Sequence, residues 1–234
     1  MGSWNVRTLS EAGALKQLDD ALATLSMDLV ALQEIWWLGN GVQNRRGKHC
    51  YDIYYSCHDR HRVFGTGFAV GPRLQPAIMD FKAINDRLCT LRMRSKFFNI
   101  SLINVHAPTE EKEEEEKDLF YGSRLVQFAA ANNLVVGSTK FARKKIHKIT
   151  WAHPDGVNLN QIDHVLVSRR RQSSLLNVRT YRGANIDSDH YLVGLVIRCR
   201  IARPRANGGG ENTQPRLNTD SIRDIIVQQE FKAA

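Results

Sequence analysis

The sequence is built from short apolar runs that end beside polar or charged residues, and this pattern restricts the folds open to it. The run at 29–33 is followed directly by Glu34. Near the other end of the chain, Asp163-His164 and Asp189-His190 border further apolar segments. Short apolar runs of this kind are typical of buried strands. The pattern therefore predicts a sheet that carries carboxylates and imidazoles at the ends of its strands.

The periodicity predicts many strands and two main helices. Apolar residues at three-to-four spacing predict a helix over 14–25, and a second, strongly acidic helix is predicted over 110–133. Gly65 and Gly67 indicate a hairpin or a bulge. Many strands with few helices favour an α/β sandwich with mostly antiparallel or mixed sheets. The predicted strands lie at 3–7, 28–34, 53–57, 65–70, 88–93, 97–105, 134–138, 147–152, 161–167, 178–182 and 191–200.

Composition divides the chain into one domain, predicted over 1–201, and a tail. Residues 202–216 contain Pro204, a run of three glycines and Pro215, a composition typical of a flexible linker. Residues 217–234 can form a short capped helix. Nothing in the domain offers this helix an evident packing face. We therefore expect it to be a peripheral element that can bind a protein partner.

The cysteines and the hydropathy indicate the compartment. The four cysteines form no Cys-x-x-Cys pair and no zinc-finger spacing, which favours free thiols in a reducing environment. No apolar stretch approaches the length of a membrane-spanning helix, and the first residues do not resemble a secretory leader. These features predict a soluble monomer in the nucleus or the cytoplasm, with no membrane partner.

The charge favours a polyanionic partner. The formal net charge is +9, which suits nucleic acid, and DNA is the expected partner. Basic side chains gather at Arg143, Lys144 and Lys145 and again at Arg169 and Arg170, where they can follow a phosphate backbone without reading sequence. Solubilising loop charges explain the same clusters equally well, and both clusters also resemble nuclear-localisation signals.

The polar residues at the strand ends suit phosphodiester chemistry. Mg²⁺ prefers carboxylate oxygens and keeps several waters, so Glu34 suits the ion and Asn5 suits an orienting role beside it. Neighbouring side chains on a strand point to opposite faces, so we expect Asp163 to pair across strands with His190 rather than with His164. His190 would then stabilise negative charge on a phosphate. The alternative is a set of structural polar residues with no catalytic role.

Five segments in order resemble one superfamily. The chain is similar over roughly residues 2–201 to the endonuclease/exonuclease/phosphatase superfamily, and within it to the endonuclease domains of LINE-type non-LTR retrotransposons. The resemblance implies a two-sheet αββα sandwich of the DNase I type that acts on DNA with Mg²⁺, or Mn²⁺. The segments that carry it are Ser3-Trp4-Asn5-Val6-Arg7-Thr8-Leu9, Ala31-Leu32-Gln33-Glu34, Ile103-Asn104-Val105-His106-Ala107-Pro108-Thr109, Asn160-Gln161-Ile162-Asp163-His164 and Ser188-Asp189-His190.

The resemblance also implies roles for individual residues. Asn5 and Glu34 would form the metal site, and an Asp163-oriented His190 would face the scissile phosphate with Asp189 beside it. His106 occupies the position of a phenol in apurinic-site nucleases, and Trp151 occupies that of a nearby aromatic that contacts nucleic acid. A core aromatic is an equally good interpretation of Trp151. The assignments are catalytic for His190, Asp163, Asp189 and His106, metal-binding for Glu34 and Asn5, and nucleic-acid-binding for Arg143, Lys144, Lys145, Arg169, Arg170 and Trp151.

Two departures from the family pattern bear on activity. The family has a Gly-Asp-x-Asn turn between the strand that ends near His106 and the helix near 128–133, and here the sequence is fused near 118–124 without that segment. A positioned acid or base contributes about 10²–10⁴ in rate, so its loss predicts an inactive or severely impaired enzyme that lacks one central segment of the fold. In addition, Ile35 and Trp36 replace the usual threonine and basic residue, so no basic side chain is expected near the metal.

Four alternatives stay open at this point. A substitute carboxylate such as Asp118 or Glu116 would leave an active Mg²⁺-dependent endonuclease. A non-catalytic chromatin or protein-interaction adaptor would act through residues 202–234. A lipid or inositol phosphatase of the same superfamily is disfavoured because the motifs resemble those of retroelement endonucleases. Finally, the chain can be the translation of a damaged retroelement copy.

Overall fold

The computed structural model describes residues 1–47, 49–107, 114–184 and 186–200, and within these it does not describe the side chains of 114–122. The linker expected at 202–216 and the helix expected at 217–234 lie outside the described residues. Among those that are described, no helix is long and apolar enough to cross a membrane. Cys50, Cys57, Cys89 and Cys199 are free thiols, as the spacing predicted.

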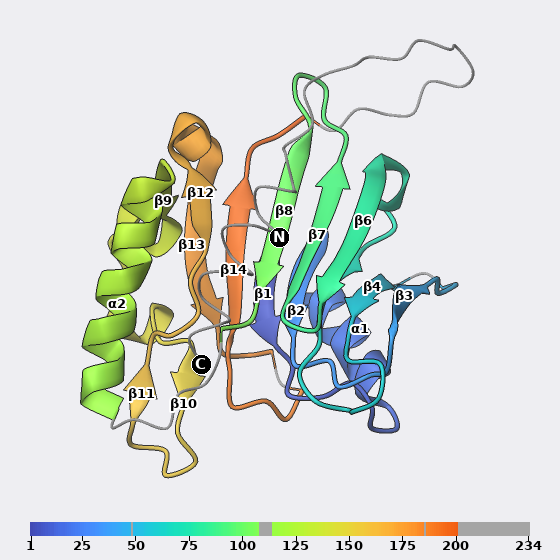
Figure 1. Cartoon of the computed structure of the whole chain (residues 1–234), viewed down its shortest axis with the longest axis horizontal. Helices are drawn as coiled ribbons and strands as arrows, with labels where there is room; N and C mark the ends of the chain where they lie inside the picture. The colour runs from blue at the N-terminus through green and yellow to red at the C-terminus, as the bar shows by residue number, and fades with distance from the viewer. Residues whose placement is uncertain (48, 108–113, 185, 201–234) are drawn as a thin grey trace. The chain divides into compact units, whose positions relative to one another are not determined.

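A seven-stranded mixed sheet forms the centre of the domain (Figure 1). β1 and β2 run parallel, and the other neighbours in the sheet are antiparallel. The helix α1 (Ala14–Thr24) connects β1 to β2, and its Leu18 and Leu22 are fully buried in the core on that face of the sheet. In order across the sheet the strands are β13 (Leu175–Tyr181), β14 (Leu192–Ile197), β1 (Gly2–Asn5), β2 (Leu29–Gln33), β5 (Thr66–Val70), β4 (Asp52–Ser56) and β3 (Asn40–Gln43).

A second, three-stranded sheet stacks on the other face of the first. It consists of β6 (Ile78–Asn85), β7 (Leu88–Met93) and β8 (Ile100–Val105), all antiparallel, and lies in front of β1 and β2 in Figure 1. The core between the two sheets joins Leu29, Phe68 and Val70 to Cys89, Leu91 and Met93. Alternate side chains of β2 thus face opposite layers, as strand geometry requires.

Two small β ribbons and the helix α2 (Glu114–Ala131) complete the described fold. β9 (Leu134–Val136) pairs with β12 (Leu166–Ser168) next to α2, and β10 (Trp151–Ala152) pairs with β11 (Leu159–Asn160). Single 3-10 turns lie at η1 (Gln75–Ala77), η2 (Gly137–Lys140), η3 (Lys145–His147) and η4 (Arg169–Ser174). α2 continues without a break through 118–124, the position at which the sequence predicts a missing segment.

The predicted α/β two-sheet sandwich of the DNase I type is confirmed, with local differences. The strand predicted at 161–167 is mostly irregular, because the backbone N–H groups of Ile162 and Asp163 both donate to Thr150 Oγ1 instead of to a neighbouring strand. The strand predicted at 147–152 is shortened by the turn η3. The sequence did not reveal β3 or β6. The hairpin predicted at Gly65 and Gly67 is present, since β4 and β5 are consecutive antiparallel strands in which Ser56 pairs with Thr66; Gly65 ends the loop between them and Gly67 lies within β5.

Candidate active site

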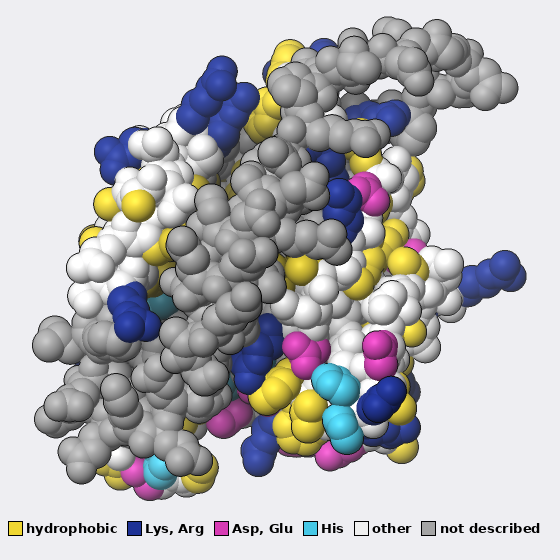
Figure 2. Space-filling model, viewed as in Figure 1, with side chains coloured by type: hydrophobic (Ala, Val, Ile, Leu, Met, Phe, Trp, Pro, Cys, Tyr) yellow, Lys and Arg dark blue, Asp and Glu magenta, His cyan; other side chains and the backbone are white. Residues whose placement is uncertain are grey.

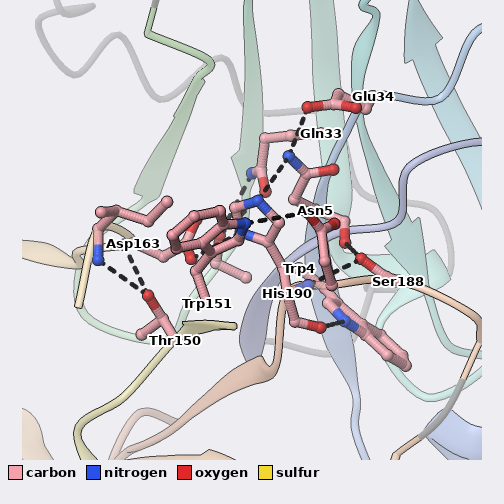
Figure 3. Close-up of polar contacts among 12 residues, drawn as sticks. Trp4, Asn5, Gln33, Glu34, Thr150, Trp151, Asp163, Ser188 and His190 are labelled. Carbon is pink, nitrogen blue, oxygen red and sulfur yellow. Dashed lines mark hydrogen bonds and ion pairs between the residues drawn. The ribbon is translucent and has the colours of Figure 1, made fainter. Parts of the chain in front are cut away.

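The candidate site lies where strand ends from both sheets converge. β1 and β2 are parallel and in register from Gly2 opposite Val30 to Asn5 opposite Gln33, so their carboxyl ends lie at the same edge. Asn5 closes β1 and Glu34 follows β2 directly. His190 precedes β14, which runs antiparallel to β1, so it reaches the same edge from the other direction. Parallel and antiparallel neighbours therefore deliver all three residues to one place (Figure 3).

The amide of Asn5 joins the two halves of the site. Its Nδ2 donates to Glu34 Oε1 at 2.7 Å and lies 3.4 Å from His190 Nε2. Its Oδ1 accepts the backbone N–H of Arg7 at 3.1 Å, which fixes the orientation of the amide. With His190 neutral and protonated on Nδ1, the two amide hydrogens serve the carboxylate and the ring nitrogen together.

The imidazole of His190 is oriented by a carboxylate. Asp163 Oδ2 lies 3.0 Å from His190 Nδ1, which is the cross-strand pair expected from the sequence. The backbone around the ring is also held, since Trp4 Nε1 donates to His190 O at 3.0 Å and Ser188 Oγ accepts His190 N at 3.1 Å. Ser188 Oγ itself donates to Asn5 O at 2.7 Å, so the loop before β14 is fastened to the end of β1.

Thr150 and Trp151 position the two aspartates. Thr150 is buried, and its Oγ1 accepts the N–H of Asp163 at 3.0 Å, which holds the irregular segment against β10. Trp151 forms a β-bridge with His190, and its Nε1 donates to Asp189 Oδ2 at 2.9 Å. Trp151 therefore lies within the site and donates a hydrogen bond to Asp189. Figure 3 shows Trp151 beside Thr150, Asp163 and His190. Sequence inspection had given Thr150 no role.

His106 approaches Glu34 from the second sheet. It follows β8, and its Nε2 lies 3.5 Å from Glu34 Oε1. Its Nδ1 is buried without a hydrogen-bond partner among the described residues. The side chain of Phe64 lies close, with ring centroids 6.0 Å apart, and Arg87 stacks 3.7 Å above the Phe64 ring while donating to Ala107 O at 3.0 Å.

Arg87 changes one expectation from the sequence. The absence of a basic residue after Glu34 predicted that the metal position would lack a nearby cation. The turn between β6 and β7 instead supplies the guanidinium of Arg87, which interacts electrostatically with Glu34 and His106. The sequence could not reveal this because Arg87 lies 53 positions after Glu34, and only the stacking of the two sheets brings them together.

The two histidines of the site are shifted in opposite directions. Burial lowers the pKa of His106, the charges of Arg87 and His190 lower it further, and Glu34 opposes them without reversing the shift. Burial also acts to lower the pKa of His190, but the hydrogen bond and charge of Asp163, with the charges of Asp189 and Glu34, raise it above its ordinary value. Near neutral pH the site thus combines a neutral His106 with a His190 that is poised to hold a proton.

Several residues around the site have a left-handed backbone. Glu34 has φ of 57°, and Arg7, Phe64 and Asp187 have φ of 58°, 55° and 57°. A non-glycine residue in this conformation costs on the order of 1 kcal/mol or more, so the surrounding structure must hold it there. In Glu34 this conformation turns the carboxylate toward Asn5 and His106.

A buried amide pair supports the site from beneath. Gln33 Nε2 donates to Asn104 Oδ1 at 2.6 Å, and Asn104 Nδ2 donates to the carbonyl oxygens of Leu32 and Gly67 at 2.7 and 2.8 Å. Asn104 belongs to β8 and its partners to β2 and β5, so this network locks the two sheets together directly behind Glu34 and His106. Both polar side chains are buried, and satisfied buried networks of this kind fix relative positions sharply.

The donor set is compatible with Mg²⁺. Among the described residues no group of three or more His, Cys, Asp or Glu side chains is placed to hold a metal ion. Mg²⁺, however, is commonly held by one or two carboxylates together with substrate phosphate and water. Glu34 is a partly exposed carboxylate oriented by Asn5, and it supplies a ligand of that kind.

The predicted nucleic-acid-binding residues fall in two separate places. Arg143 donates to Asn177 Oδ1 on β13, and Lys144 and Lys145 flank the turn η3 beside the same strand, where Arg179 adds a further cation. Arg169 and Arg170 lie in η4, before the start of β13 and away from the strand ends that carry His190. Of the predicted residues, the structure therefore brings together Asn5, Glu34, His106, Trp151, Asp163, Asp189 and His190.

Comparison with known proteins agrees with this geometry. No family model matches the sequence. Craniofacial development protein 2 of Tragulus javanicus is 28% identical over 247 residues, which cover 86% of this chain and 42% of that protein, so this chain spans less than half the length of its relative. Among solved structures, the endonuclease domain of TRAS1, a telomere-specific non-LTR retrotransposon, superposes with a TM-score of 0.59 at 13% identity over 84% of this chain and 96% of that one. The AP endonuclease LMAP from Leishmania major superposes with a TM-score of 0.63 at 13% identity over 84% of this chain and 86% of that one.

These structural matches establish the fold. The chain has the DNase I-like fold of the endonuclease/exonuclease/phosphatase proteins, and its sequence is similar to craniofacial development protein 2.

Proposed function

We propose that this chain is a phosphodiesterase domain of the DNA endonuclease type, in which phosphate recognition is retained and hydrolysis is severely impaired. The observation that carries the proposal is the Asn5 amide, which connects Glu34 to a His190 oriented by Asp163. Such an arrangement places a cation-binding carboxylate and a proton-bearing imidazole side by side. A phosphate group has oxygens for both.

In this proposal Glu34 would hold Mg²⁺, or Mn²⁺, and the ion would neutralise charge on the phosphate oxygens. His190 donates from Nε2 to a phosphate oxygen once the ring is protonated, because protonation turns Nε2 from an acceptor of the Asn5 amide into a donor. Asp163 stabilises that protonated form through Nδ1. Arg87 adds a positive charge on the side of His106.

The expected impairment of hydrolysis rests on the sequence near 118–124, which lies within α2. No Gly-Asp pair occurs anywhere in the chain, and the family turn supplies both the carboxylate that activates water and the amide that holds the phosphate. His106 does not replace this base, because Glu34 lies beside it while its other nitrogen is buried. Losing a positioned base alone lowers the rate by about 10²–10⁴.

Plasmid nicking and metal binding together test the proposal. Supercoiled plasmid is incubated with the protein and Mg²⁺ or Mn²⁺, while the rise in thermal stability on adding either ion is measured separately. We expect nicking at the background level and ion-dependent stabilisation that disappears in Glu34→Gln. Glu11→Gln, an exposed carboxylate on the approach to α1, is the matched control and should retain the stabilisation.

Two results would contradict the proposal. Strong nicking that is lost in both Glu34→Gln and His190→Gln would show a competent enzyme, with Glu116 or Asp118 as the first candidates for a substitute carboxylate. Equal stabilisation of Glu34→Gln and the parent by Mg²⁺ would remove Glu34 from the metal site.

A further inference from the structure

A concentrated basic surface lies at the end of the sandwich opposite the candidate site. The turn between β7 and β8 contributes Arg94 and Lys96, which are both exposed. The turn η4 contributes three consecutive exposed arginines, Arg169 to Arg171. Arg198 and Arg200, which follow the end of β14, are also exposed. We call these three segments, 94–98, 169–174 and 198–200, the distal basic surface.

Backbone hydrogen bonds join the three segments into one surface. The N–H of Lys96 donates to Arg200 O at 2.6 Å, and Ser95 Oγ donates to the same oxygen at 2.9 Å. The N–H of Arg198 donates to Ser174 O at 2.8 Å. The cations therefore keep fixed positions relative to one another, although they come from distant parts of the sequence.

Two phenylalanines lie among these cations. The side chain of Phe97 is 65% exposed, and Lys96 Nζ and Arg200 Cζ lie 5.6 and 6.0 Å from the centre of its ring. Phe98 is partly buried, and the guanidinium of Arg171 stacks on it at 3.7 Å. Aromatic side chains among cations are what proteins use to bind single-stranded nucleic acid, so Phe97 distinguishes this surface from a purely cationic one.

The three segments are strongly cationic, although the carboxylate of Asp28 acts electrostatically on Cys199, between Arg198 and Arg200. The three segments contain six arginines and one lysine and no Asp or Glu. No ion pair formed within the described part of the chain involves any of the seven. Figure 2 shows Lys and Arg side chains together with hydrophobic ones along the upper edge of the view, where Figure 1 places η4 and the β7–β8 turn.

The distal basic surface is separate from the candidate site. The strand β8 has six residues, with the β7–β8 turn before it and His106 after it. The strand β14 also has six residues, with His190 two positions before it and Arg198 directly after it. At about 3.3 Å per residue, roughly 20 Å separates the two ends. A small ligand bound to the distal basic surface therefore does not contact Glu34 or His190.

We propose that the distal basic surface binds single-stranded nucleic acid, with Phe97 as a stacking platform for a base and the surrounding arginines on the phosphates. Arginine recognises phosphate in a bidentate manner and also stacks on flat π-systems, which explains a cluster of six arginines better than a general need for solubility. A duplex keeps its bases stacked inside and offers no free face to Phe97, whereas single strands do. This inference does not depend on catalysis at the candidate site.

Fluorescence anisotropy of a labelled dT20 oligonucleotide tests the proposal on the whole chain. His190→Gln in EDTA serves as the background, so that hydrolysis cannot intervene. We expect Phe97→Ala to weaken binding about tenfold and Phe97→Trp to retain it, because a stacked base is worth roughly 1–3 kcal/mol. The triple change Arg94→Ser, Arg169→Ser and Arg170→Ser should reduce the slope of log affinity against log salt by about 2, at roughly 0.7 per lost contact.

The matched control removes three exposed cations elsewhere, in the triple change Lys16→Ser, Arg46→Ser and Arg60→Ser. It should leave the salt slope and the effect of Phe97→Ala unchanged. Three results would overturn the proposal: an equal loss in the control triple, tighter binding of a duplex than of dT20 with no effect of Phe97→Ala, or binding only to phosphatidylserine vesicles.

Discussion

The pair of Asp163 and His190 gives a quantitative prediction, because Asp163→Asn removes a charge and leaves an acceptor in place. The two side chains are 22% and 12% exposed, and Oδ2 lies 3.0 Å from Nδ1. Exposed ion pairs contribute about 0.2–1 kcal/mol, and hydrogen bonds to charged groups about 1.5–3 kcal/mol. Partial burial places this pair toward the second range. We therefore expect Asp163→Asn to lower the free energy of unfolding by about 2 kcal/mol when His190 is protonated.

The sign of the pH dependence follows from the raised pKa of His190. A histidine whose pKa is higher in the folded state stabilises the fold below its unfolded pKa of about 6.5, and this contribution is lost as pH rises through the folded pKa. At high pH the neutral ring still donates from Nδ1, and an asparagine oxygen accepts this bond, although less strongly than a carboxylate. The cost of Asp163→Asn should thus fall below about 1 kcal/mol at pH 9.

Urea denaturation followed by tryptophan fluorescence at pH 5.5 and pH 9 measures both values, and the double variant with His190→Gln isolates the pairwise part. The cycle is run in a His106→Gln background, because the charges of His190 and Asp163 both act on the pKa of His106 and its titration would otherwise differ between the variants. Asp155→Asn is the control, since Asp155 Oδ2 lies 3.0 Å from His153 Nδ1 in a more exposed pair, with side chains 38% and 41% exposed, and its effect should be much smaller. A cost of Asp163→Asn that is the same at both pH values would refute the assignment of His190 as the proton-holding group.

Three further predictions concern the backbone and core of the site. Glu34→Gly should be more stable than Glu34→Ala by about 1 kcal/mol in urea denaturation, because only glycine adopts φ of 57° without strain; equal stabilities would show that the backbone relaxes. Asn104→Ala should lower the free energy of unfolding by about 3 kcal/mol, because it removes the side-chain donor of two buried carbonyl oxygens and one of the two acceptors of the Gln33 amide; a cost below 1 kcal/mol would mean that water replaces the amide. Gly67→Ala should lower the free energy of unfolding by more than about 3 kcal/mol, since its Cβ would lie 2.2 Å from Tyr54 O, and near-normal stability would contradict the close packing of β4 on β5.

Much of the fold was available from local patterns. The spacing of leucines around Leu18 defines α1, and the uninterrupted apolar run before Glu34 defines β2, because burial on one or both faces imposes its own periodicity on a sequence. The partly alternating strands β7 and β14 were found in the same way. The segment around Asp163 was misjudged, since its apolar composition reflects packing, whereas its backbone is held by the hydroxyl of Thr150.

The sequence by itself determined which chemical groups stand at the strand ends: Asn5, Glu34, Asp163 and His190 each follow or precede an apolar run, and local hydrophobic patterning is a property of a few consecutive residues. Only the tertiary structure decided the rest. Strand pairing and sheet stacking brought Arg87 beside His106, placed Trp151 on Asp189, and joined Arg171, Phe98 and Arg200 into one surface. These contacts link residues that are tens of positions or more apart, and their geometry depends on the register and packing of whole strands, which no local pattern encodes.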